Sequence, residues 1–105
     1  MRRGEVWWAE LPQPTGRRPV VLLSRDAAYK VRTSVTVGVI TRTTRAIPVE
    51  VPLGTEDGMP QQCVANLDDI FTIPKTRLVE LITTLSPQKM TAIGRAIIFA
   101  LNLKP

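Results

Sequence analysis

Residues 17–23 read Arg17-Arg18-Pro19-Val20-Val21-Leu22-Leu23, a basic pair followed by a proline and an unbroken apolar run. Such a run is typical of a strand that is covered on both faces. Pro19 lacks the N–H group that a central ladder position needs, so we expect it to open the strand. The segment therefore predicts a buried strand with two arginines at the point where a loop becomes the strand.

Strand-like segments continue on both sides of this run. Alternating valines after residue 34 indicate a strand. Pro52 indicates that the strand expected over residues 49–53 lies at the edge of the sheet. The pair Asp68-Asp69 interrupts residues 64–73, which we expect to form two short strands around it. Polar residues 25–33 indicate a loop with room for a helical turn. The remaining strands are expected over residues 5–11, 35–40, 49–53 and 78–85.

The last part of the chain predicts a helix. Ser86 is a favourable N-cap, and Pro87 suits the first helical position. An apolar stripe at helical spacing follows, made of Met90, Ile93, Ile97 and Leu101. Residues 98–100 make the last turns apolar nearly all round, which is typical of a buried helix, and a second subunit could cover part of it.

Together these elements predict an α+β fold that is mainly β: a small curled antiparallel sheet or barrel with the C-terminal helix packed on it. A chain of 105 residues is expected to form one domain, residues 1–105. We expect no signal peptide, because no apolar segment follows the charged N-terminus. The longest apolar run, residues 96–101, is far too short to span a membrane. A single cysteine suits a reducing, cytoplasmic location.

The charge balance points to an anionic partner. The formal net charge of +5 favours nucleic acid, although a basic protein without a polyanion partner fits the charge equally well. The chain has no histidine and one cysteine, Cys63, so we expect neither a metal site nor a cofactor. Without a histidine to activate its thiolate, Cys63 is expected to be a small buried hydrophobic residue.

Arg18 and Thr41 are the strongest candidates for catalytic residues. A guanidinium presents a planar fork that matches phosphate oxygens, and Arg18 precedes the fixed backbone of Pro19. Thr41 ends an alternating strand, where its hydroxyl can donate to a phosphoryl oxygen. The alternatives are a surface arginine before an edge strand and a threonine that serves strand propensity alone. Together the two residues predict a phosphate clamp.

Other polar side chains are candidates for contacts to a nucleic acid. Basic and hydroxyl-bearing loop residues suit backbone phosphates, or they form solvated turns. Asn66, Asp68 and Asp69 lie beside a strand, where an asparagine or aspartate can read a base edge or serve turn formation. Of Trp7 and Trp8, one should enter the core and the other should contact a partner or stack on a base. The polar candidates are Arg17, Lys30, Arg32, Arg42, Thr43, Arg45, Asn66 and Asp68.

At these residues the sequence resembles the MazF/PemK/Kid family of toxin endoribonucleases, the toxin components of type II toxin–antitoxin systems. The resemblance covers nearly the whole chain and rests on the order and spacing of its segments. Residues 2–7 resemble the family's opening strand, and residues 17–24 its arginine-proline strand. Residues 39–41 match the strand that ends in the family's threonine; segments 47–51 and 64–68 and the C-terminal helix follow.

The resemblance implies a compact SH3-like barrel that forms a homodimer and cleaves single-stranded RNA at short sequences without a metal. It implies an antitoxin partner whose acidic, extended C-terminal tail covers the active groove. Arg18 matches the family's catalytic arginine and Thr41 its catalytic threonine. Asp68 matches an acid that shapes substrate binding in some members, while Asn66 occupies a position that is basic in at least one relative.

The sequence also departs from the family pattern. The loop over residues 12–16 is short and lacks the Gly-Ser-Glu-Gln type of sequence found in many relatives. Asp69 stands where glutamine is common. These departures bear on the gating of the groove and on the recognised RNA sequence, and they leave Arg18 and Thr41 untouched.

The mechanism that we infer is attack of a ribose 2′-OH on the adjacent phosphorus, leaving a 2′,3′-cyclic phosphate and a 5′-OH end. The substrate supplies the nucleophile, so the protein has to supply alignment and charge stabilisation, which a buried guanidinium at Arg18 would provide. Two rival functions remain open. One is a toxin of the same general fold that poisons DNA gyrase, as CcdB does, without catalysis; the other is a non-catalytic RNA-binding module.

Overall fold

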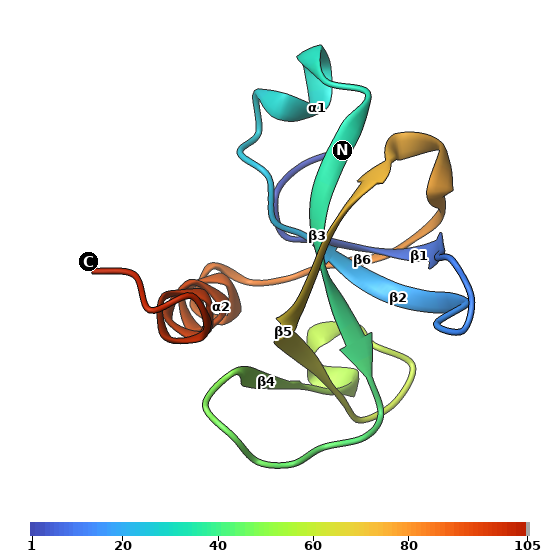
Figure 1. The fold of residues 1–105 in the computed structure, drawn as a ribbon. Coiled ribbons are helices and arrows are strands. Elements are labelled where there is room, and N and C mark those ends of the chain that lie inside the picture. Colours follow the sequence, from blue (N-terminus) through green and yellow to red (C-terminus); the bar gives the residue numbers. More distant parts are fainter. Residues whose placement is uncertain (105) are drawn as a thin grey trace.

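The computed structural model describes residues 1–104, and its six strands form one antiparallel sheet in the order β4-β5-β3-β2-β1-β6. The sheet curls, and helix α2 packs against β4 and β5 (Figure 1). The predicted mainly β fold with a C-terminal helix is confirmed. The strands are β1 Glu5–Glu10, β2 Arg17–Leu22, β3 Ser34–Thr41, β4 Glu50–Leu53, β5 Cys63–Pro74 and β6 Leu78–Thr84; the helices are the single turn α1 Ala28–Val31 and α2 Pro87–Ala100, with 3-10 turns at Thr55–Asp57 and Lys75–Arg77.

β2 is the buried strand that the apolar run predicts. It lies between β1 and β3, and Val20, Val21 and Leu22 are fully buried. Pro19 is the third residue of β2, opposite Trp8 of β1, so the prediction that it opens the strand is wrong. The ladder between β2 and β3 starts at Val20, which leaves Pro19 outside the central pairing that would need its N–H.

Apolar side chains cover both faces of the curled sheet. One cluster lies between the sheet and α2 and includes Ile40 and Ile93, both fully buried. A second cluster on the opposite face contains Val20 and Leu22. Because successive side chains of a strand point to opposite faces, Val21 belongs to the first cluster and its two neighbours to the second. This alternation explains why the whole run is apolar.

β5 differs from the sequence prediction. Its 12 residues form one strand instead of two short ones. Gly38 of β3 lies opposite Ile70, but the next residue, Val39, lies opposite Asn66. Residues 67–69 are therefore a bulge, which lets the strand continue through the acidic pair. The edge position predicted for the segment of Pro52 is confirmed, because β4 pairs with β5 alone.

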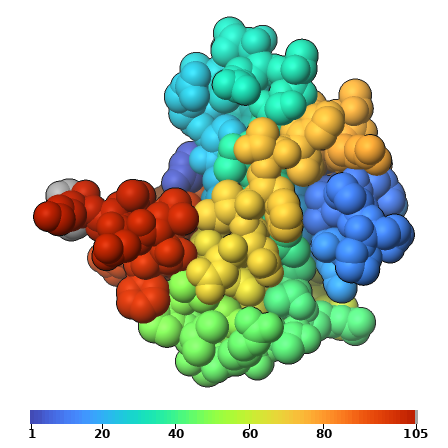
Figure 2. Space-filling model, viewed as in Figure 1, coloured from blue at the N-terminus to red at the C-terminus, as the bar shows by residue number. Residues whose placement is uncertain are grey.

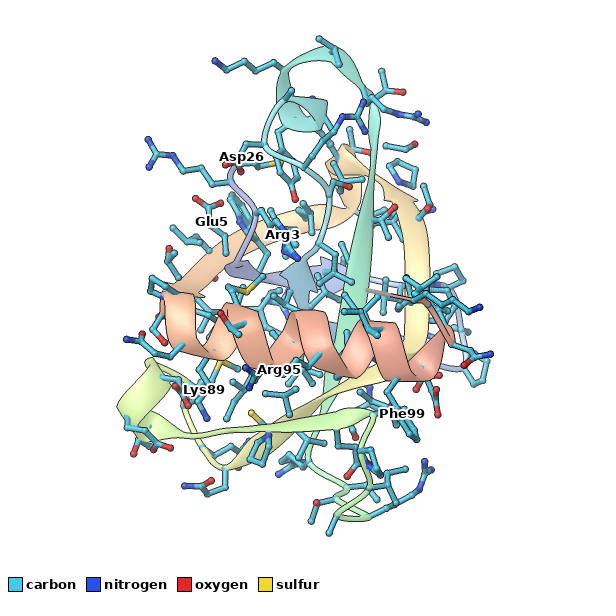
Figure 3. The ribbon with its side chains drawn as sticks, turned by 90° about the vertical axis from the view of Figure 1, so that its left-hand side faces the viewer. Arg3, Glu5, Asp26, Lys89, Arg95 and Phe99 are labelled. Carbon is cyan, nitrogen blue, oxygen red and sulfur yellow. The ribbon has the colours of Figure 1, made fainter. Side chains whose placement is uncertain are left out.

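α2 begins as the sequence predicts but leaves its last turn uncovered. The Ser86 hydroxyl oxygen accepts a hydrogen bond from the Lys89 N–H at 3.1 Å. Leu101 lies beyond the helix and is 56% exposed, so it does not belong to the packed stripe. Phe99 is 60% exposed, and Figure 3 shows it with Arg95 along α2. Figure 2 shows α2 standing out at one side of the molecule.

No helix within residues 1–104 combines the length and the apolar character that crossing a membrane requires.

Candidate functional site

Arg18 and Thr41 lie at neighbouring strand ends. The ladder between β2 and β3 pairs Val20 with Val39, and Val21 with Gly38. Continued by two residues in the same antiparallel register, it places Arg18 opposite Thr41, the last residue of β3. Strand pairing therefore brings together two residues that the sequence separates by a loop and a helical turn.

Two surface pockets meet at this pair. Pocket 1 has a volume of about 260 Å³ and pocket 2 of about 290 Å³, and Arg18 and Thr41 are the two residues that line both. The other residues of pocket 1 are Trp8, Arg17, Pro19, Ile40, Arg42, Met59, Pro60, Gln61 and Cys63, and those of pocket 2 are Pro14, Thr15, Val39, Thr43, Arg45, Asn66 and Asp69. The pair thus stands on the boundary between two hollows that could each receive part of one ligand.

The arginines around pocket 1 differ in their partners. Arg17 Nη1 lies 3.0 Å from Glu10 Oε1, and its guanidinium carbon lies 5.2 Å from the centre of the Trp8 ring. Within residues 1–104, no carboxylate oxygen lies within 4.0 Å of a side-chain nitrogen of Arg18 or Arg42. Arg18 and Arg42 are therefore available to an anion, while Arg17 is already engaged.

Arg18 is exposed in this chain, so the expectation of a buried guanidinium is not met. Water around an exposed guanidinium weakens its interaction with a charge on a ligand. Water at Arg18 must therefore be displaced by the bound ligand itself or by a second subunit before the guanidinium reaches its full electrostatic effect.

The hydroxyl group of Thr41 acts as a hydrogen-bond acceptor within the protein. Its Oγ1 accepts a hydrogen bond from the Thr43 N–H at 3.3 Å. A hydroxyl has one proton to donate in addition to its lone pairs. Because the protein uses Oγ1 as an acceptor, the proton is left to donate toward the pockets. This arrangement suits donation to an anionic oxygen beside Arg18.

Glu50 organises the loop between β3 and β4, and the sequence pattern does not single it out. Its Oε1 accepts hydrogen bonds from the backbone N–H groups of Arg45 at 2.8 Å and Ala46 at 3.1 Å. The Thr44 hydroxyl donates to the same oxygen at 3.4 Å. Glu50 is 9% exposed, and its Oε2 is buried with no hydrogen-bond partner in the described chain. The carboxylate therefore holds the loop that places Thr43 and Arg45 at pocket 2.

The acidic pair of the β5 bulge divides between two environments. Asn66 is 5% exposed and lines pocket 2 together with Asp69. Asp68, which the sequence suggests as the contact residue, is exposed but lines neither pocket 1 nor pocket 2. Asp69, which the sequence offers beside Asp68 as an acceptor for a base and which departs from the family pattern, is the acid that lines pocket 2. A pairing shift inside a strand has no clear sequence signal, so this assignment needed the structure.

Other predicted contact residues lie elsewhere. Lys30 and Arg32 are at α1, beside the start of β3, whereas Thr41 ends that strand (Figure 1). The eight residues of β3 extend over about 23 Å, so the structure does not bring these two residues to Arg18. Trp7 and Trp8 are both half-buried, so the tryptophan that faces the core is only partly covered. Trp7 packs against the second core cluster, and Trp8 lines pocket 1.

The surroundings of Cys63, the one cysteine of the chain, bear on whether its thiol could act as a nucleophile. Cys63 is buried as predicted, and burial, with a smaller effect of the nearby Asp57, raises the pKa of its thiol. A raised pKa disfavours the thiolate that a nucleophile requires. Within residues 1–104, no three side chains of the histidine, cysteine, aspartate or glutamate type gather as metal ligands would.

Known proteins resemble this chain in both sequence and fold. A family model described as PemK-like, MazF-like toxin of type II toxin–antitoxin system matches residues 2–101. The probable endoribonuclease MazF2 of Mycobacterium tuberculosis is 42% identical over 91 residues, which are 86% of this chain and 87% of that protein.

Two solved structures share the fold at higher coverage. The Mycobacterium tuberculosis toxin MazF-mt6 superimposes with a TM-score of 0.89 at 33% identity, covering 96% of this chain and 99% of that one. An endoribonuclease in complex with its cognate antitoxin, from a mycobacterial species, has a TM-score of 0.88 at 28% identity, covering 100% of this chain and 98% of that one. Sequence and fold lead to one assignment: the chain belongs to the PemK-like, MazF-like toxins of type II toxin–antitoxin systems.

Proposed function

We propose that this toxin, an endoribonuclease, cleaves single-stranded RNA at short sequences without a metal ion, and that Arg18 and Thr41 bind the scissile phosphate. One observation carries the proposal: these two residues line both pockets. A strand of RNA that crosses from one pocket to the other has to pass them. The absence of an acidic partner for Arg18 within the described chain leaves its fork open to phosphate oxygens.

The reaction begins when the ribose 2′-oxygen attacks the neighbouring phosphorus. A new O2′–P bond forms, the P–O5′ bond breaks, the 2′-hydroxyl proton is lost to solvent, and the leaving O5′ gains a proton. The products are a 2′,3′-cyclic phosphate and a 5′-OH end. The RNA provides the nucleophile, so neither a catalytic serine nor a cysteine is needed.

The protein acts on the charge that builds up at phosphorus. Arg18 offers two parallel N–H donors to the phosphoryl oxygens, which gain negative charge in the transition state. Thr41 donates its free hydroxyl proton to the same group and fixes its orientation. A guanidinium stays protonated in proteins and is a poor base near neutral pH, so we assign Arg18 charge stabilisation and no part as a general base.

The remaining residues of the two pockets hold the RNA on either side. Arg42 and Arg45 attract the phosphates, whereas Arg17, paired with Glu10, adds only to the general positive charge. Trp8 offers a half-buried ring, one side of which Arg17 contacts, on which a base can stack. The same basic groove is suited to an acidic, extended tail of a cognate antitoxin, which would compete with RNA for the site. We place this function in the cytoplasm, where a single unpaired cysteine is stable.

We expect purified protein to cleave single-stranded RNA equally well in buffer and in excess EDTA, because the site uses a guanidinium in place of a metal. Mapping of the cut ends should give 5′-OH termini next to 2′,3′-cyclic phosphates. Cleavage that EDTA abolishes and magnesium restores would contradict this mechanism. Intact RNA that is shifted in a gel and released by salt would favour the non-catalytic module, and inhibition of gyrase with intact RNA would favour the gyrase poison.

We also propose a homodimer, the commonest symmetric assembly. Three large apolar side chains are exposed at and just beyond the end of α2: Phe99, Leu101 and Leu103. Exposed apolar patches on a protein surface often mark an interface with another subunit. We expect light scattering to give about twice the chain mass of 11.7 kDa at micromolar concentration. A mass of one chain that does not change with concentration would exclude the dimer.

A further inference from the structure

The bulge in β5 presents one carboxylate to pocket 2. Between Gly38 and Val39 the partner in β5 jumps from Ile70 to Asn66, so residues 67–69 have no partner in β3. Leu67 enters the core, and the two aspartates that follow are exposed. Asp69 lines the pocket that Arg18 and Thr41 also line. A carboxylate repels phosphate. We therefore expect Asp69 to contact a part of the ligand other than its phosphates.

Asn66 fixes the position of this carboxylate. Its Oδ1 accepts a hydrogen bond from the Asp68 N–H at 3.0 Å, and its Nδ2 donates to Asp69 Oδ2 at 3.3 Å. Both ends of the buried amide form hydrogen bonds within the bulge, and only 5% of Asn66 is exposed, so it is poorly placed to read a base edge as the sequence suggests. Its effect is to orient Asp69.

Asp69 has capacity left for a ligand. A carboxylate is an acceptor only, with about four lone-pair sites on its two oxygens. In residues 1–104 the one side-chain partner of Asp69 is Asn66, and no arginine or lysine nitrogen lies within 4.0 Å of its oxygens. The pocket thus presents a carboxylate with unused acceptor sites, which only a group with hydrogen-bond donors can match.

We propose that Asp69 reads the base of the nucleotide in pocket 2 and selects guanine, an inference that rests on the proposed RNA cleavage and names a specificity residue for it. The Watson–Crick edge of guanine places N1–H and the exocyclic N2–H side by side, which matches the two oxygens of a carboxylate. Adenine and cytosine place an acceptor beside their amino group, and uracil flanks its single N–H with two carbonyls. The pocket volume of about 290 Å³ equals that of roughly ten waters, which is room for one base.

The first experiment maps the 5′-OH ends of a random single-stranded RNA pool cut by the unaltered protein, Asp69→Ala, Asp69→Asn and Asp68→Ala. We expect the unaltered protein to favour guanine at one position beside the cut by about five- to tenfold, the low end for a bidentate base contact because Asp69 is exposed. Asp69→Ala should lose that preference and keep the preferences at other positions. Asp69→Asn keeps the volume and a partner for Asn66 but replaces one acceptor with a donor, so it should lose guanine as well.

Asp68→Ala distinguishes the two neighbouring acids. It removes the same charge one residue away, at a side chain that does not line pocket 2, and it should keep the guanine preference. If Asp69→Ala retained the preference of the unaltered protein, or if Asp68→Ala alone removed it, the inference would be overturned. Equal thermal unfolding of the three variants and the unaltered protein confirms that the change arises in the pocket.

A second experiment reads base selection without cleavage. A random RNA pool with 2′-O-methyl groups on every ribose has no nucleophile, so it reports binding alone. The bound fraction should be enriched in guanine by the unaltered protein and not by Asp69→Ala, and inosine, which lacks the N2 amine, should bind the unaltered protein several-fold more weakly than guanosine. Selection that depends on Asp69 in a protein that cuts no RNA would refute the proposed cleavage alone. Absence of any guanine enrichment would refute the role of Asp69 alone.

Discussion

Replacing Arg18 with alanine should lower the rate of RNA cleavage by about 10²–10³-fold, the usual effect of removing one preorganised donor from a developing charge. The rate constant should be measured in single turnover at saturating protein, so that weaker binding is not mistaken for slower chemistry. The fold should be unchanged, because the Arg18 side chain is exposed and forms no ion pair in the described chain. Circular dichroism and thermal unfolding check this point.

Two variants show whether charge or geometry causes the loss at Arg18. Arg18→Lys keeps the charge but not the planar fork, and it should recover only part of the rate. Arg95→Ala removes the same charge from α2 (Figure 3), at an exposed residue that lines neither pocket. Its cleavage rate should stay near that of the unaltered protein. If Arg18→Ala cleaved at full rate, the assignment of the phosphate clamp would be wrong.

Glu50→Ala should both destabilise the protein and weaken RNA binding. The substitution removes the acceptor of two backbone N–H groups and of the Thr44 hydroxyl. Part of this loss of stability is offset, because the substitution also removes Oε2, a buried oxygen with no hydrogen-bond partner in the described chain. We expect a loss of about 2 kcal/mol, seen as a fall in Tm of about 8–16 °C. Because Thr43 and Arg45 would no longer be held at pocket 2, KM for RNA should rise more than kcat falls.

The matched variants separate the loop from general stability. Glu50→Gln keeps an oxygen that can accept from Arg45 and Ala46, so it should recover much of the stability and of the KM. Glu80→Ala removes an exposed glutamate from β6 and should change neither quantity by much. All Tm values need one protein concentration, since dimer formation makes Tm depend on it. A KM unchanged in Glu50→Ala would show that the loop does not contribute to RNA binding.

Features that depend on neighbouring residues were predictable from the sequence. The apolar run 20–23 determines a buried strand because each face of β2 meets its own core cluster. Pro52 determines an edge strand because proline cannot donate to a second neighbour. Ser86 and Pro87 determine where α2 begins, through a side-chain cap and a fixed φ. Each of these effects acts between residues that are close in the sequence, so the local sequence pattern is enough to predict it.

Features that depend on pairing between distant segments needed the tertiary structure. The sequence by itself identified Arg18 and Thr41 as candidates, but the register of β2 and β3 decided that they lie opposite each other on the boundary between two pockets. The bulge in β5 decided that Asp69, and not Asp68, enters pocket 2. The length of β3 kept Lys30 and Arg32 away from Thr41. The physical reason is that a shift of one residue in a strand turns a side chain to the other face, and such a shift is set by contacts with another strand that the local sequence does not contain.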